Sequence, residues 1–149
     1  MARDRLYSVA FLVAAGIVLS VVGAAAVAIG WLNPRLISDQ LPADAAIDAP
    51  AVGGAAVALG SAVTALGIAH LAIAVALGRR VAGALTVGVV LTAGMGLLSL
   101  GFAVAALVSI SSGAAPPILM AVAAVALGVA FIAYAATAAA MIGAQKPPV

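Results

Sequence analysis

The chain has 149 residues, of which 67% are hydrophobic and only 7% are charged. A soluble domain carries about a quarter charged residues, so this composition excludes a water-soluble fold. Six Lys and Arg against four Asp and Glu form no basic cluster for nucleic acid, and the absence of cysteine excludes disulfides and thiolate ligands.

Charged residues divide the sequence into apolar stretches that are long enough to cross a bilayer. The charge-free stretches are 6–34, 49–78 and 81–145. A hydrocarbon core of about 30 Å needs roughly 20 apolar helical residues, so each of the first two stretches fits one span. The third fits two spans, separated by the serine- and proline-containing segment 111–117. We therefore predict transmembrane helices at about 6–32, 51–78, 81–110 and 118–143.

The first predicted helix has an alternative interpretation as a secretory signal peptide. Residues 1–26 combine a basic start, an apolar run and the small residues Ala24, Ala25 and Ala26, as a cleavage site requires. The apolar run continues to Trp31, however, which is long enough to span, and alanine is so common here that such a site arises by chance. We favour an uncleaved spanning helix with Trp31 as an interfacial anchor.

The basic residues predict the orientation of the chain. Five of them fall on one side of the predicted spans: Arg3, Arg5, Arg79, Arg80 and Lys146. The opposite loop, 33–50, holds one arginine and three aspartates. Lys and Arg accumulate in cytoplasmic loops. We therefore predict a multi-pass protein of the plasma membrane, with both termini cytoplasmic and 33–50 outside.

Small residues recur along one side of three predicted helices. These sets are Gly16, Ser20, Ala24 and Ala28, then Gly60, Gly67 and Ala74 beside His70, and finally Ala84, Gly88, Thr92 and Gly96. Small residues let helix backbones approach each other in lipid, so we expect these faces to contact protein. On the second helix we expect another face to contact lipid: Leu59, Leu66, Ile73 and Leu77. The predicted fold is all-α, a compact bundle of two hairpins forming one transmembrane domain over residues 1–149.

Among the intramembrane polar residues, His70 is the one ionisable candidate. It lies roughly 12 Å of helical rise from the cytoplasmic end of its span. One histidine provides neither the ligand pair of a haem nor a zinc site, so we predict no cofactor and no metal. A hydrogen-bonded packing role is the simplest interpretation, and proton handling or a ligand role shared with a partner stays open. Tyr134 lies at similar depth, and because unpaired polar groups are costly in hydrocarbon, we predict that the two meet.

The sequence contains no catalytic, cofactor or nucleotide motif, so we expect that the protein is not an enzyme. The aspartates of the 33–50 loop lack the glycine and closing glutamate of a calcium loop and indicate a solvated connection. We predict an accessory or assembly subunit of a larger membrane complex. Its expected partners are the lipid bilayer and other membrane subunits or a second copy, without nucleic acid. The alternative is an oligomeric small-solute transporter or channel.

Overall fold

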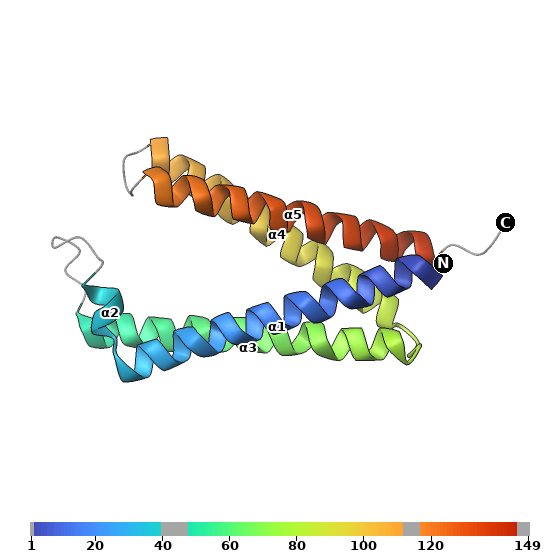
Figure 1. Ribbon diagram of the computed structural model, residues 1–149, viewed down its shortest axis with the longest axis horizontal. Helices are drawn as coiled ribbons and strands as arrows, with labels where there is room; N and C mark the ends of the chain where they lie inside the picture. Colours follow the sequence, from blue (N-terminus) through green and yellow to red (C-terminus); the bar gives the residue numbers. More distant parts are fainter. Residues whose placement is uncertain (1, 40–47, 112–116, 146–149) are drawn as a thin grey trace. The chain divides into compact units, whose positions relative to one another are not determined.

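The computed structural model of the protein describes residues 2–39, 48–111 and 117–145 (Figure 1). The helices are α1 (Ala2–Leu32), α2 (Arg35–Ser38), α3 (Ala49–Gly78), α4 (Ala84–Ser111) and α5 (Pro117–Gln145). Four of them, all but the short α2, are long and apolar enough to cross a membrane. The predicted all-α class is therefore confirmed, as is the presence of four helices of sufficient length and apolar composition to span a membrane.

The helix boundaries differ from the predicted ones mainly at three places, and one of them is the start of α1 at Ala2, four residues earlier than expected. The short helix α2 was not predicted, and α4 begins at Ala84, three residues later than expected. At the start of α3, Asp48 caps the helix because its Oδ1 accepts a hydrogen bond from the backbone N–H of Ala51 at 2.9 Å. Asp44, Lys146 and residues 112–116 of the predicted turn lie outside the described residues.

The long helices form two antiparallel hairpins. One consists of α1 and α3 and contains residues 10–75, and the other consists of α4 and α5 (Figure 1). Residues 2–9 and 76–83 group with the second hairpin. Each hairpin is compact in itself, and their association into one bundle stays a prediction.

Six glycines form the contact between α1 and α3, and we call this set the glycine seam. Its antiparallel pairs are Gly16 with Gly67, Gly23 with Gly60, and Gly30 with Gly53. A Cβ added to any of the six would stand 2.6–2.9 Å from the carbonyl oxygen of its paired glycine. Real Cβ atoms do not approach that closely, so the two backbones are in direct contact along the seam.

The seam repeats every seven residues on both helices, and this spacing corrects part of the predicted stripe on α1. Seven residues turn an α-helix to within about 20° of two full turns, so such residues stay on one face. A step of four residues drifts by about 40° each time. The predicted stripe therefore leaves the contact after Gly16 and Ser20, and Ala24 and Ala28 are exposed. Ala24 and Ala28 therefore lie outside the contact between α1 and α3.

Ser20 lies within the seam, opposite Gly67. Its Oγ is buried and has no hydrogen-bond partner among the described residues. A Cβ on Gly67 would collide with this hydroxyl group and would stand 2.6 Å from the Ser20 nitrogen. Ser20 thus contributes to the seam through its small size rather than through a hydrogen bond.

The second hairpin packs through a continuous stripe on α4. Its buried members are Ala84, Gly88, Thr92, Gly96, Ser99, Ala103 and Ala106. The packing is looser than in the glycine seam, because a Cβ on Gly96 would stand 3.5 Å from the Tyr134 Cβ, an ordinary contact distance. On α5, Tyr134 and Met141 are buried at 6% and 1% exposure. The two large side chains Tyr134 and Met141 are buried on α5 together with the small residues Ala124, Thr137 and Ala138.

The end of α3 is closed by a Schellman motif. The N–H of Val81 donates to the carbonyl oxygen of Ala76, and the N–H of Arg80 donates to that of Leu77. Arg80 occupies the position that needs a left-handed backbone, with φ 57°, and Gly83 follows with φ 80°. These two conformations keep residues 81–83 out of the helix, which explains the late start of α4.

The same turn overturns one expectation about the lipid-facing side of α3. Leu77 was predicted to contact lipid, but it is completely buried, whereas Leu59 is 68% exposed as expected for that face. Leu77 belongs to the part of α3 that groups with α4 and α5, because the chain reverses direction directly after it. The predicted lipid-facing stripe therefore does not include Leu77.

Replacing Arg80 by glycine is expected to stabilise the protein. A non-glycine residue in the left-handed region costs about 1–2 kcal/mol, and glycine avoids most of this cost. The matched control is Arg79→Gly, which removes the same charge from the neighbouring position, where φ is not positive. Thermal unfolding in mild detergent should give a higher Tm for Arg80→Gly than for Arg79→Gly. Equal Tm values would contradict the role of the positive φ.

Candidate functional site

His70 is completely buried on α3. Its Nδ1 lies 2.7 Å from the carbonyl oxygen of Leu66, one turn earlier on the same helix. A carbonyl oxygen can only accept, so Nδ1 carries the hydrogen atom and donates it. In the neutral ring Nε2 is then an acceptor, which fits a hydroxyl donor such as that of a tyrosine.

Tyr134, the predicted partner, is also buried, but it belongs to the other hairpin. Its Cβ packs over Gly96 of α4. The exposed fraction of Tyr134 is 6%, so its side chain lies in the protein interior. The structure places His70 and Tyr134 each in the interior, and their mutual contact stays a prediction.

A double-mutant cycle tests this contact. His70→Ala and Tyr134→Phe each remove one side of the predicted hydrogen bond, and interhelical hydrogen bonds in membranes average about 0.6 kcal/mol. We expect a coupling energy of about that size in unfolding experiments in mild detergent. Strictly additive effects of the two substitutions would exclude the pairing.

Several hydroxyl groups within the long helices are bonded to their own backbones. Each donates to the carbonyl oxygen four residues earlier, at 2.8–2.9 Å, and the donors are Thr64, Thr92, Ser99 and Thr137. Such local bonds satisfy the hydroxyl without offering it to a neighbour or a solute. Gly88, Thr92 and Gly96 are buried together on α4, so Thr92 serves the packing of that helix.

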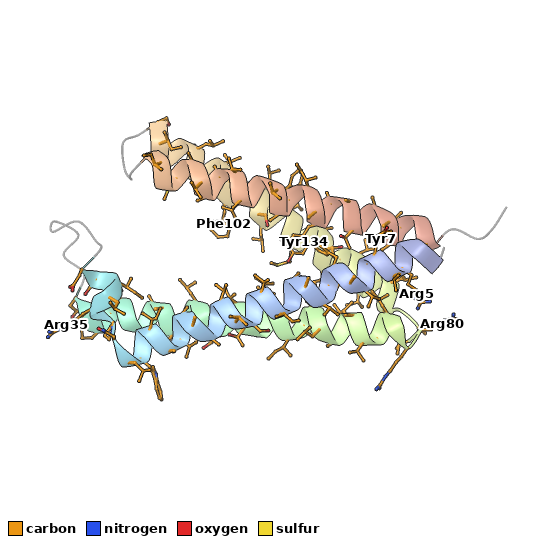
Figure 2. The ribbon with its side chains drawn as sticks, in the orientation of Figure 1. Arg5, Tyr7, Arg35, Arg80, Phe102 and Tyr134 are labelled. Atoms are coloured by element: carbon orange, nitrogen blue, oxygen red, sulfur yellow. The ribbon has the colours of Figure 1, made fainter. Side chains whose placement is uncertain are left out.

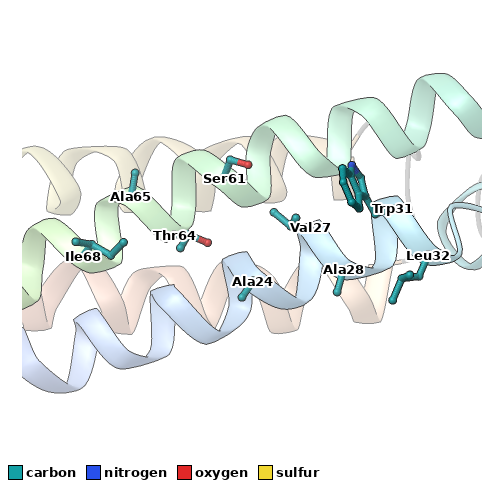
Figure 3. A pocket seen from close by; sticks show the side chains of 9 residues that line it. All are labelled: Ala24, Val27, Ala28, Trp31, Leu32, Ser61, Thr64, Ala65 and Ile68. Carbon is teal, nitrogen blue, oxygen red and sulfur yellow. The ribbon is translucent and has the colours of Figure 1, made fainter.

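An apolar groove of about 540 Å³ lies between α1 and α3 (Figure 3). Its lining residues are Ala24, Val27, Ala28, Trp31, Leu32, Ser61, Thr64, Ala65 and Ile68. Trp31 and Leu32 stand at one end of the groove and Ile68 at the other (Figure 3). Its volume lies within the range of about 300–1,000 Å³ that is typical of ligand sites.

Sequence reasoning missed this groove, although a signal was present. The seven-residue spacing of Gly16, Gly23 and Gly30 identifies the face of α1 that meets α3. Ala24 and Ala28 lie off that face, so their small side chains open a groove beside the seam instead of closing a contact.

Within residues 2–39, 48–111 and 117–145, no group of three His, Asp or Glu side chains lies close enough to hold a metal ion. No known protein family matches the chain, and no curated protein and no solved structure is significantly similar to it. Any function must therefore be argued from the chain itself.

Proposed function

We propose that the protein is an accessory or assembly subunit of a larger membrane complex, without catalytic activity. The local hydrogen bonds of Thr64, Thr92, Ser99 and Thr137 carry this proposal. A solute pathway needs polar groups directed into it, whereas these hydroxyls are turned to their own helices. A helix surface without polar chemistry suits contacts with lipid and with other membrane helices.

The exposed apolar side chains support the same proposal. Leu97, Phe102 and Val90 of α4 are 63–69% exposed, and α5 exposes Ile132 and Val125 to a similar degree. In a bilayer this surface faces lipid or a neighbouring subunit, since no charged residue interrupts it. We propose that part of it is covered by the helices of a partner subunit.

The proposed orientation places both termini in the cytoplasm of a plasma-membrane protein, with the two hairpins forming one bundle. The exposed pair Arg79 and Arg80 in the turn between α3 and α4 supports this orientation. At the other end of α3, the exposed Asp39 and Asp48 outnumber Arg35 among the described residues. The loop containing these aspartates is accordingly placed outside.

Single cysteines test this orientation, because the native chain contains none. Ala43→Cys in the predicted outer loop and Ser111→Cys at the exposed end of α4 should react with a membrane-impermeant thiol reagent on intact cells. Val81→Cys, at a position 53% exposed in the turn after α3, should react only after the membrane is opened. Labelling of position 81 in intact cells would show that the proposed topology is inverted or wrong.

Purification from native membranes in mild detergent tests the proposed function. We expect other membrane proteins to co-elute in a fixed stoichiometric ratio, and deletion of the chain to reduce the amount of the assembled complex. A homo-oligomer that elutes without partners and conducts a small solute in liposomes would instead favour the transporter or channel alternative. A partner-free chain without transport would overturn both proposals.

A further inference from the structure

The apolar groove between α1 and α3 ends beside charged residues. Trp31 and Leu32 form that end (Figure 3), and Arg35 follows Leu32 by three residues, within about 11 Å along the chain. Arg35 and Asp39 are both exposed, and one helical turn separates them on and after α2. Figure 2 shows Arg35 at the end of the hairpin where α1 and α3 are connected. One end of the apolar groove therefore lies close in the sequence to a basic and an acidic side chain.

We propose that the groove holds one acyl chain of a phospholipid with an ethanolamine headgroup, and that this headgroup lies against Arg35 and Asp39. This site goes beyond the proposed subunit function and does not depend on it. Trp31 is the sole tryptophan of the chain and follows a long apolar run, so this end of the groove lies at headgroup level.

The lining of the groove favours a hydrocarbon chain over a polar molecule. Ala24, Ala28 and Ala65 leave room beside the helices, while Val27 and Ile68 supply apolar walls (Figure 3). The lining contains two hydroxyl side chains, Ser61 and Thr64. Thr64 donates its hydroxyl hydrogen to the carbonyl oxygen of Gly60 at 2.9 Å. Its polar group is therefore satisfied by its own helix, and it presents little polarity to the groove.

The charges at the groove end select the headgroup. A guanidinium such as that of Arg35 binds phosphate through parallel N–H donors. Residues four apart in a helical segment lie about 5–6 Å apart, so Asp39 is placed to meet a group attached close to that phosphate. A primary ammonium donates hydrogen bonds to a carboxylate, whereas a quaternary choline has no hydrogen to donate.

An anionic headgroup fits this end less well. Asp39 and Asp48, which stand after α2 and before α3, are exposed and carry two negative charges against the single positive charge of Arg35. A lipid with a net negative headgroup would gain the contact with Arg35 but would be repelled by both carboxylates. The expected order of affinity is ethanolamine, then choline, then glycerol headgroups.

Trp31 provides the measurement without any labelling, because it lines the groove and is the sole tryptophan. The protein is reconstituted in vesicles that mix a non-brominated phospholipid with one carrying brominated acyl chains, which quench tryptophan on contact. Quenching curves then give relative binding constants for the ethanolamine, choline and glycerol headgroups. We expect preferences of about two- to fivefold between successive lipids, the size that exposed charge pairs provide.

Two substitutions and one matched control test where the headgroup preference arises. Ala24→Leu fills the groove and should abolish the headgroup preference. The control Ala25→Leu, at an exposed neighbour outside the lining, should leave the preference unchanged. Arg35→Gln should remove the distinction between headgroups while quenching persists. Circular dichroism checks that all three variants keep the native helix content.

Three results would overturn the site. Equal quenching by brominated lipids with all three headgroups would mean that the groove makes only non-selective contact with lipid. The same effect of Ala24→Leu and Ala25→Leu would separate the preference from the groove. Protection of Trp31 from every brominated lipid, increasing with the protein-to-lipid ratio, would mean that a second copy fills the groove instead.

Discussion

Gly60→Ala is expected to lower the free energy of unfolding by about 1–3 kcal/mol, the usual cost of overpacking a closed interface. A Cβ at this position would stand 2.7 Å from the carbonyl oxygen of Gly23 and 2.8 Å from the backbone nitrogen of Val27. Backbone atoms cannot move aside as a flexible side chain can, so α1 and α3 must separate. This separation weakens contacts along the whole seam.

Gly54→Ala is the matched control on the same helix, because a Cβ there meets no atom within 4 Å. Alanine favours a helix over glycine by nearly 1 kcal/mol, so this control should be neutral or slightly stabilising. Unfolding in mild detergent, followed by circular dichroism, compares the two. Similar behaviour of both variants would contradict the direct backbone contact.

Gly96→Leu in the second hairpin is expected to destabilise the protein, again by about 1–3 kcal/mol. The first carbon of a new side chain would fit, since a Cβ there stands 3.5 Å from the Tyr134 Cβ and 3.7 Å from Cδ2 of Phe131. The outer carbons of leucine would then overlap these two side chains. Gly96→Ala should therefore be tolerated, unlike Gly60→Ala in the glycine seam.

Val90→Leu serves as the control for bulk on α4, because Val90 is 68% exposed and the extra carbon faces outward. The Tm of the three α4 variants should fall only for Gly96→Leu. A loss of stability for Gly96→Ala equal to that for Gly60→Ala would mean that the two hairpins are packed equally tightly. Tolerance of Gly96→Leu would place the α4 stripe outside the interface.

The spans could be predicted from the sequence because hydrophobicity and charge act residue by residue. The stretch 49–78 contains no charged residue, because charged side chains are unfavourable in hydrocarbon. This signal can be recognised without knowing which other helices the stretch contacts. The helix ends depended on local backbone chemistry instead. The late start of α4 follows from the left-handed conformations of Arg80 and Gly83, and an arginine gives no sequence signal for such a conformation.

The contacts between helices were harder to predict, because alanine and glycine are so frequent that several faces look equally suitable. The α4 stripe from Ala84 to Gly96 is buried, but the similar series on α1 leads from Gly16 to the exposed Ala28. Only glycine permits direct backbone contact, whereas alanine does not. Because the prediction treated glycine and alanine as equivalent small residues, it did not detect the seven-residue spacing of the glycines. For the same reason it did not detect the groove beside them.

The glycine seam also has a consequence for how the protein is made. All six glycines lie between residues 16 and 67, so the ribosome has produced both sides of the seam before α4 emerges. Helices that are neighbours in the chain meet at a low entropic cost of loop closure. The first hairpin can therefore close in the bilayer while the second is still being synthesised, and α4 and α5 enter a membrane that already holds a folded pair.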